Sequence, residues 1–175
     1  MDNIHNMSTT GSAFSHPWIK AFIFNGPYAY SLFSIWFLIK RIPFLVGFLV
    51  WFAINSSTNK VLKQWIREPR PNNYQQIHDG GQYTRAEIYG MPSGHSQTIF
   101  FVVMYVWMVL QNISLTLTGL FVAALTLYQR WADKKHTISQ LAVGCVVGLL
   151  MGWASYKITK RAISILHTKK QIMTL

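Results

Sequence analysis

Charge of either sign is scarce in this chain, and acidic residues are the scarcest. Only 12% of the 175 residues are charged, with 5 acidic against 16 basic side chains. A soluble domain usually carries about 25% charged residues. Hydrophobic residues make up 51% of the chain, aromatic residues 15%, and the mean hydropathy is +0.22. Because so little charge cannot coat a globular surface in water, the composition excludes an ordinary soluble domain and indicates an integral membrane protein.

Cysteine is almost absent as well. The single cysteine, Cys145, lies inside an apolar run, so neither a disulfide framework nor a cysteine metal site is available. The few acidic residues form no cluster suited to holding Mg²⁺. We therefore expect no metal and no cofactor, and the length of 175 residues is enough for one domain.

Basic residues are the charge that the chain does have, and they give it a formal net charge of +11. In a soluble protein this excess would suggest a nucleic-acid partner. Here the basic residues stand beside apolar runs, as in Lys40-Arg41 and in Lys157, Lys160 and Arg161, which is typical of charges that flank membrane helices. We therefore expect the lipid bilayer as a partner and no nucleic acid.

Five apolar segments follow one another along the chain and predict an all-α, polytopic bundle of about five to six membrane helices. They cover residues 18–39, 42–54, 96–110, 113–128 and 138–156. The tripeptide Asn25-Gly26-Pro27 interrupts the first segment, so this helix is expected to be kinked or to start late. A crossing needs about 20 apolar residues, so the third and fourth segments suffice only if their polar ends continue as helix.

Three glycines mark one face of the last apolar segment. Gly144, Gly148 and Gly152 recur at every fourth position and so lie along one side of a helix. Small residues at this spacing allow two membrane helices to approach closely. We expect this face to pack against another helix of the bundle.

The connections between the segments differ in length and polarity. Residues 40–41 and 111–112 form tight turns, whereas residues 67–92 and 129–137 are polar and hold four of the five acids. If the helices alternate in direction, both polar connections fall on one membrane face, and the active site is expected there, at the helix ends. The positive-inside rule then makes the basic tail cytoplasmic and the polar connections external or lumenal.

This organisation divides the chain into a polar N-terminal tail, one embedded domain and a basic C-terminal tail. The tails cover residues 1–17 and 161–175, and the embedded domain covers 18–160, with the loops expected to form the site at about 63–95 and 129–137.

Two of the three clusters on the polar face come from the first long connection. Lys63 and Arg70 are seven residues apart, which is two helical turns, and can project to one side. The prolines on either side of Arg70 end the helix and fix the chain there. At Pro-Ser-Gly-His (92–95), free backbone N–H groups of Ser93 and Gly94 at a helix start are expected to form an anion site.

The third cluster places Arg130 and His136 in the shorter connection. Together the clusters offer three cations, backbone donors and, with His95, two histidines. A phosphoryl transition state spreads negative charge over oxygens that fixed cations and N–H groups can stabilise. One imidazole could attack phosphorus while the other protonates the leaving oxygen, so the set favours phosphoryl transfer without a metal.

These clusters, in this order, resemble the three-part signature of the type 2 phosphatidic acid phosphatase superfamily. It is an α-helical family of membrane lipid phosphatases that also includes soluble acid phosphatases and vanadium haloperoxidases. The matching residues are Lys63-x6-Arg70-Pro71, Pro92-Ser93-Gly94-His95 and Arg130-x5-His136. The resemblance implies hydrolysis through a phosphohistidine, with His136 as nucleophile and His95 as general acid. By it, the phosphate is held by Lys63, Arg70, Ser93, Gly94 and Arg130.

The chain departs from the family pattern at two positions. Gln129 stands where the family usually has Ser, and Gln140 stands where it usually has Asp, four residues after the nucleophilic histidine. A carboxylate there would hold the imidazole tautomer and stabilise positive charge, whereas Gln140 can orient the ring but supplies no charge. Asp133 is a candidate substitute for the missing carboxylate if its loop is helical.

The stretches "REPRP", "YGMPSGHSQ" and "HTISQ" are similar to the dolichyldiphosphatase branch of the superfamily, in which Gln140 is a branch feature. This resemblance implies a polyprenyl diphosphate substrate, cleaved to the monophosphate and phosphate on the lumenal face of an endoplasmic-reticulum-type membrane if the source is eukaryotic. Two alternatives stay open, a broader phosphatidate-type lipid phosphatase and a catalytically impaired protein that binds lipid phosphates. Assembly into a homo-oligomer stays open too.

Overall fold

The chain folds as a bundle of helices. The computed structural model describes residues 16–71 and 88–173, and its regular elements are all helical, with one isolated β-bridge between Pro69 and Tyr89. The all-α prediction is confirmed. In chain order the elements are α1 (Pro17–Phe24), α2 (Gly26–Leu38), the 3₁₀ turn η1 (Ile39–Arg41), α3 (Ile42–Ile66), α6 (Gly94–Leu110), α7 (Ile113–Ala132) and α8 (Ile138–Met173).

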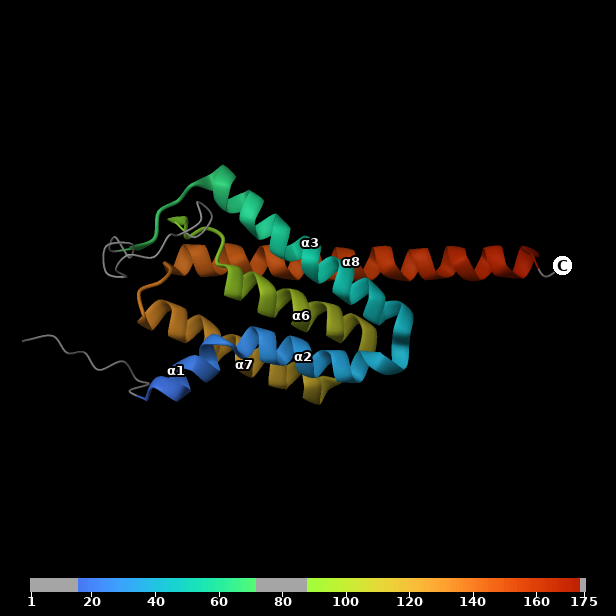
Figure 1. Cartoon of the computed structure of the whole chain (residues 1–175), viewed down its shortest axis with the longest axis horizontal. Helices are drawn as coiled ribbons and strands as arrows, with labels where there is room; N and C mark the ends of the chain where they lie inside the picture. Colours follow the sequence, from blue (N-terminus) through green and yellow to red (C-terminus); the bar gives the residue numbers. More distant parts are fainter. Residues whose placement is uncertain (1–15, 72–87, 174–175) are drawn as a thin grey trace, which may run out of the picture.

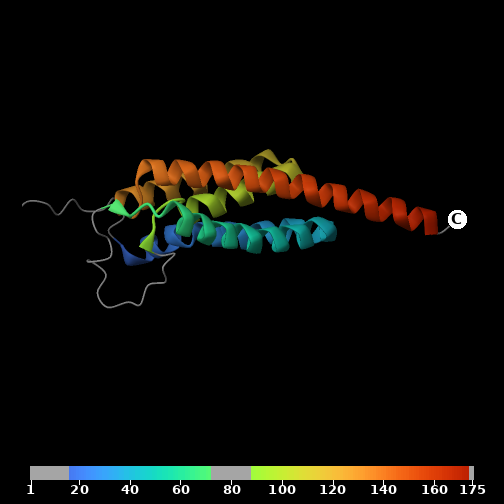
Figure 2. The ribbon, with the colours of Figure 1, turned by 90° about the horizontal axis from the view of Figure 1, so that it is seen from above.

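Successive long helices run up and down the bundle (Figure 1). The chain turns at η1 and again between α6 and α7 at one end, drawn on the right. The end of α3, the start of α6 and the short connection from α7 to α8 lie together at the other end, drawn on the left, and the view from above shows the same arrangement (Figure 2). The described parts of both polar connections therefore share one end, as expected from alternating helices. This end is called the site end below.

Local sequence sets the helix limits. The predicted interruption of the first apolar segment is confirmed, because α1 ends at Phe24 and α2 starts at Gly26 with a proline in its first turn. The tight turn after α6 uses Gln111 in the left-handed region, with φ of 51°. Asn112 then caps α7, its side chain accepting the N–H of Leu115 at 2.9 Å.

Helix α6 forms the centre of the bundle and packs against α2, α3, α7 and α8. Phe101 and Tyr105 are fully buried on it and pack against Phe48 of α3, the first ring stacked and the second tilted, so these two aromatics of α6 are packing residues. The guanidinium of Arg41 donates to the carbonyl of Val109 at 2.6 Å, which satisfies a free acceptor at the end of α6.

The predicted glycine face is confirmed as the contact between α8 and α6, and it is called the glycine seam below. A β-carbon at Gly144 would lie 2.7 Å from the carbonyl oxygen of Ser93, and one at Gly152 would lie 2.7 Å from that of Phe101. A β-carbon at Gly148 would collide with the carbonyl oxygen of Gln97. Any side chain at these positions would push the two helices apart.

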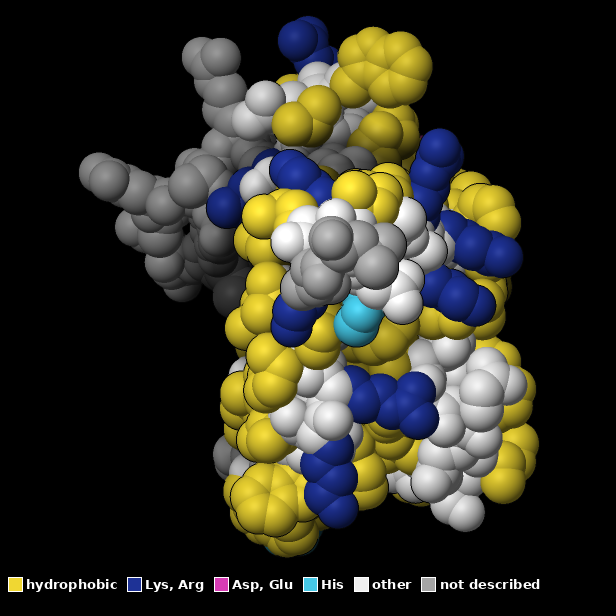
Figure 3. All heavy atoms as spheres, turned by 90° about the vertical axis from the view of Figure 1, so that its right-hand side faces the viewer, with side chains coloured by type: hydrophobic (Ala, Val, Ile, Leu, Met, Phe, Trp, Pro, Cys, Tyr) yellow, Lys and Arg dark blue, Asp and Glu magenta, His cyan; other side chains and the backbone are white. Residues whose placement is uncertain are grey.

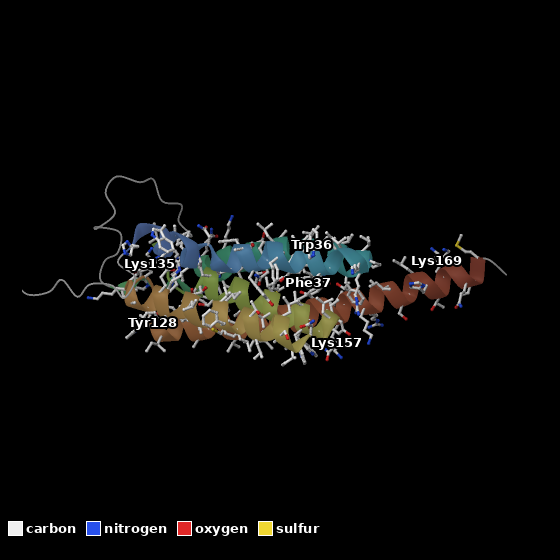
Figure 4. All side chains as sticks on the ribbon, turned by 90° about the horizontal axis from the view of Figure 1, so that it is seen from below. Trp36, Phe37, Tyr128, Lys135, Lys157 and Lys169 are labelled. Atoms are coloured by element: carbon white, nitrogen blue, oxygen red, sulfur yellow. The ribbon has the colours of Figure 1, made fainter. Side chains whose placement is uncertain are left out.

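Two helical stretches of the described chain are long and apolar enough to cross a membrane, Gly26–Ile66 and Ile138–Met173. The first folds back at η1, and α6 is apolar but shorter. Large apolar side chains cover the outside of the bundle, such as Trp36 of α2, which is 73% exposed (Figure 4). The bundle of five to six crossings stays a prediction.

Helix α8 continues past the other helices, away from the site end (Figure 1). Lys169 lies on this extension, whereas Lys157 lies on the part of α8 that still runs beside the bundle (Figure 4). Seen from the same end, the molecule shows Lys and Arg side chains and none of its described acidic side chains (Figure 3). The end with the extension is therefore basic, whereas the described acids Glu68 and Asp133 lie at the site end, among basic residues.

Candidate active site

The first cluster extends beyond the helix on which it begins. Lys63 is buried in the last turns of α3, with 6% of its surface exposed, and its Nζ donates to the carbonyl of Tyr89 at 2.8 Å. The helix ends at Ile66 because Arg67 adopts the left-handed conformation, with φ of 55°. Arg70 therefore lies past the helix, and the expectation that both cations share a helix face is wrong. The guanidinium still reaches the third cluster, since Nη1 donates to the carbonyl of Lys135 at 3.2 Å.

The second cluster begins α6, and its backbone is used differently from the expectation. Ser93 is fully buried at the N-cap of α6, and its N–H donates to the carbonyl of Gln140 at 3.0 Å. This N–H is therefore not a free donor for an anion. The Oγ of Ser93 is buried and has no hydrogen-bond partner in the described part of the chain, so the hydroxyl is the group of Ser93 that remains for a phosphate oxygen. Gly94 leaves room for Asn59, whose Oδ1 would lie 3.2 Å from an added β-carbon.

Three amide side chains hold this turn in place. Gln97 of α6 donates to the Oδ1 of Asn55 at 2.9 Å and accepts from the Nδ2 of Asn59 at 2.8 Å. Asn59 also donates to the carbonyl of Pro92 at 3.2 Å. All three amides are buried, so the start of α6 is locked to α3 by a polar network inside the bundle. Asn55 and Asn59, one helical turn apart in an apolar segment, are the sequence signal that could have revealed it.

Arg130 and His95 lie against each other. Arg130, in the last turn of α7, is 3% exposed, and its Nη2 hydrogen-bonds the Nε2 of His95. Phe24 of α1 packs on both, with its ring centroid 4.3 Å from the guanidinium carbon and 4.9 Å from the imidazole centroid. Tyr28 of α2 contacts His95 edge-on at 5.8 Å. These two aromatic neighbours were missed from the sequence, because nothing in their spacing links them to either residue.

His136 is more buried than His95, with 4% of its surface exposed. Its Nδ1 lies 3.2 Å from the Oε1 of Gln140, and its Nε2 lies 3.4 Å from the Nη1 of Arg70. Burial lowers the pKa of His136 to about 3, with further lowering from the charges of Arg70, Lys63 and Arg130 and partial opposition from the bond to Gln140. The ring is therefore neutral near pH 7 and can act as a nucleophile.

Gln140, the predicted partner of His136, lies beside the ring, whereas a carboxylate that contacts Gln140 was missed from the sequence. Gln140 is fully buried beside the ring, whereas Asp133 faces Lys135, with 4.0 Å between its Oδ2 and the Nζ. Residues 133–137 form a turn and not a helix, so the condition set for Asp133 is not met. Glu68 brings a carboxylate to this group, because its Oε1 accepts a hydrogen bond from the Nε2 of Gln140 at 2.9 Å.

An open pocket of about 510 Å³ lies beside His136, between the segment after α3 and the start of α8. Within residues 16–71 and 88–173, no three His, Cys, Asp or Glu side chains are grouped so that they could hold a metal ion. Cations, histidines and a buried hydroxyl from the three clusters thus meet at one end of a helical bundle. This arrangement gathers, in a helical protein, positive charge and hydrogen-bond donors of the kind that bind phosphate-like anions.

The sequence profile of the PAP2 superfamily matches residues 44–164, and the chain belongs to this superfamily. The resemblance seen in the three motifs is thereby confirmed. The match takes in Lys63, Arg70 and Arg130 as well as both histidines.

Curated relatives carry two kinds of name. Dolichyldiphosphatase 1 of Mus musculus is 32% identical over 144 residues, which cover 73% of this chain and 58% of the relative. The protein of that name in Dictyostelium discoideum is 30% identical over 130 residues, 67% of this chain and 52% of the relative. Lipid phosphate phosphatase epsilon 1, chloroplastic, of Arabidopsis thaliana is 32% identical over 116 residues, 59% of this chain and 38% of the relative. The chain thus spans little more than half the length of the dolichyldiphosphatases it matches, and no solved structure matches it significantly.

Proposed function

We propose that this protein is an integral-membrane, metal-independent lipid phosphatase that hydrolyses a dolichyl-type polyprenyl diphosphate to the monophosphate and phosphate. The observation that carries the proposal is the setting of His136, a buried and neutral imidazole whose Nε2 faces Arg70. A neutral imidazole beside fixed cations is what attack on a phosphoryl group requires. The names of the dolichyldiphosphatase relatives and the stretches flanking the motifs support the polyprenyl substrate.

In the first step, the Nε2 of His136 attacks the terminal phosphorus, and the bond from that phosphorus to the bridging oxygen breaks. Lys63, Arg70 and Arg130 take up the charge that develops on the phosphoryl oxygens, with the hydroxyl of Ser93 and the N–H of Gly94 as further donors. His95 gives a proton to the bridging oxygen, which leaves with the lipid monophosphate.

In the second step, water attacks the phosphorus of phospho-His136 and the N–P bond breaks. His95 now accepts a proton from this water, so both histidines return to their starting states and inorganic phosphate is released. In the structure Arg130 donates to the Nε2 of His95, so this nitrogen carries no proton before substrate binds. A phosphate oxygen that takes over the donors of Arg130 frees the Nε2, and His95 then takes up from solvent the proton that it gives in the first step.

The basic residues at the end with the α8 extension, which shows no described acid, support an orientation in the membrane. The basic end with the α8 extension lies in the cytoplasm, and the site end faces the lumen or the extracytoplasmic side. Residues 18–160 form the membrane-embedded domain between the polar tail and the basic tail. In a eukaryotic cell the membrane would be of the endoplasmic-reticulum type.

Phosphate release from purified protein in detergent with EDTA tests this function. Dolichyl diphosphate, farnesyl diphosphate and phosphatidate are supplied in parallel, and His136→Ala serves as the inactive control. Release from the polyprenyl substrates that survives EDTA and is lost in His136→Ala is the expected result. Phosphatidate hydrolysed best would favour the broader lipid phosphate phosphatase that the chloroplastic relatives suggest. No release from any substrate by folded protein would leave the impaired lipid-phosphate-binding alternative.

A further inference from the structure

We propose that Glu68 is a positioning residue that acts on His136 through the side-chain amide of Gln140. The inference rests on the proposed function and deepens it, because it says what replaces the carboxylate that the superfamily usually places beside the nucleophilic histidine. Glu68 lies just after α3 and Gln140 lies in the first turn of α8, 72 residues later in the chain.

The two hydrogens of the Gln140 amide are both used. Its Nε2 donates to the Oε1 of Glu68 at 2.9 Å and to the carbonyl of Pro69 at 2.8 Å. If the amide were turned over, its oxygen would face two acceptors, which is unfavourable in a fully buried side chain. Glu68 and the carbonyl next to it therefore fix which end of the amide points toward His136.

The amide oxygen then decides which nitrogen of His136 carries the proton. The Oε1 of Gln140 accepts from the N–H of Thr137 at 3.2 Å and lies 3.2 Å from the Nδ1 of His136. Because an amide oxygen can only accept, Nδ1 holds the hydrogen and Nε2 keeps the lone pair. That lone pair is on the nitrogen that faces Arg70 and would attack phosphorus.

The backbone around Gly90 holds Glu68 next to the amide of Gln140. The N–H of Gly90 donates to the carbonyl of Glu68 at 2.8 Å, and a β-carbon at Gly90 would collide with the amide of Gln140. The glycine in the "YGMP" stretch therefore makes room for the amide while its own backbone holds Glu68. Tyr89, next to it, forms the β-bridge with Pro69.

Glu68 also supplies the negative charge that an amide lacks. When His136 bonds to phosphorus its ring becomes cationic, and Lys63, Arg70 and Arg130 around it oppose that charge. A carboxylate at the far end of the amide polarises it toward the ring and offsets part of this repulsion. Glu68, Gln140 and His136 thus form a hydrogen-bonded series in which the charge of Glu68 acts on His136 through the neutral amide of Gln140.

The first test separates charge from shape. Glu68→Gln keeps an oxygen that can accept from Gln140 but removes the charge, so kcat should fall about tenfold with KM little changed, less than when a group touching the reacting atoms is lost. Glu68→Ala also frees the amide to turn over and should cost more. Asp133→Asn removes another acid at the site end as a comparison. A loss as large in Asp133→Asn as in Glu68→Gln would mean that total charge alone matters, and would overturn the inference.

The second test uses the variant Gln140→Asp, which places a carboxylate next to His136 itself. When Glu68→Gln is added to Gln140→Asp, kcat should not fall further, because the carboxylate at position 140 already supplies the negative charge. It should even rise, because the double variant no longer holds two carboxylates side by side. An equal loss from Glu68→Gln in both backgrounds would make Glu68 a structural residue and overturn the inference. If thermal unfolding shows that Gln140→Asp does not fold, the comparison of Glu68→Gln with Asp133→Asn decides alone.

A readout that needs no activity keeps the two proposals apart. In protein labelled with ¹⁵N-histidine, the signal of His136 is identified by its loss in His136→Asn. We expect the Nδ1–H tautomer in the wild-type protein and a mixture in Glu68→Ala. This result in a protein that releases no phosphate would support the positioning role and overturn the proposed function. A tautomer unchanged in Glu68→Ala would overturn the positioning role whatever the activity.

Discussion

The Nδ1 of His136 lies 3.2 Å from the side-chain oxygen of Gln140, in a position where a neutral amide accepts from a neutral ring. The same ring is buried among cations, and its pKa is lowered to about 3. The fold therefore holds His136 in the form that a nucleophile needs, and it does so at the expense of the protonated form.

This setting predicts an acid-sensitive fold. The pKa of an unfolded histidine is about 6.5, so the stability that His136 contributes is fully present above that pH. As the pH falls below this value, the unfolded chain takes up a proton that folded His136 refuses, and stability is lost down to about pH 3. We expect the midpoint of thermal unfolding in detergent to drop less between pH 7 and pH 4.5 in His136→Asn than in wild type.

His167→Asn removes an exposed histidine of α8 and is the control for this measurement. It should follow the wild-type pH dependence. An acid sensitivity in His136→Asn equal to that of wild type would show that His136 accepts a proton as readily in the folded protein as in the unfolded one.

Lys63 and Lys60 form a matched pair for testing the phosphate site. Both lie on α3, but Lys63 is buried at the site end whereas Lys60 is exposed. Lys63→Gln should lower kcat/KM about 10²-fold, because one fixed cation is lost from the transition state. Inorganic phosphate should also raise the unfolding temperature of the wild-type protein and of Lys60→Gln but not of Lys63→Gln. Equal phosphate responses in the two variants would remove Lys63 from the anion site.

The amide network around Gln97 predicts a stability defect with a specific rescue. Gln97→Leu leaves buried groups of Asn55 and Asn59 without their partner, at a cost of about 1–3 kcal/mol for each unsatisfied group. Unfolding in denaturant with the protein in detergent measures this loss. Asn55→Leu in addition should restore part of the stability, since loss of both partners leaves fewer buried groups unpaired. Strictly additive losses would argue against a coupled network.

The glycine seam predicts that one added methyl group is enough to disturb the site. Gly148→Ala forces a β-carbon against the backbone of α6 and should destabilise the fold by about 1–3 kcal/mol. Ala142→Val, an enlargement at an exposed position of the same helix, is the control and should have little effect. Activity should fall with stability in Gly148→Ala, because the second cluster begins on the helix that is displaced. A stable Gly148→Ala variant would mean that the helices can separate without cost.

Periodicity and turn chemistry were enough to predict much of the fold. The interruption at residues 25–27, the grouping of the described polar connections at one end and the glycine face all follow from local pattern. The resemblance of the motifs to the superfamily likewise depends on residue types at fixed spacing. Each of these features depends on residues close together in the chain, so it can be predicted from one sequence.

Contacts between segments that are distant in the chain could not be predicted from local sequence pattern. The bond between Glu68 and Gln140 joins residues 72 positions apart, and the contacts of Phe24 with Arg130 depend on how α1 meets α7. The N–H of Ser93 was expected to be free, because a helix start read alone offers its donors to any anion. Only the position of α8 shows that the carbonyl of Gln140 already accepts it.

The glycine seam has a consequence for how such a protein can vary. Ser93, two residues before His95, is in contact with Gly144, and Gln140 lies one turn before that glycine. Main chain without side chains therefore sets the spacing between the two motifs. Side chains on the outer surface can then be exchanged to suit a thicker or thinner bilayer, or a different lipid tail, without altering that spacing. The protein thus separates adaptation to its membrane from the geometry of its chemistry.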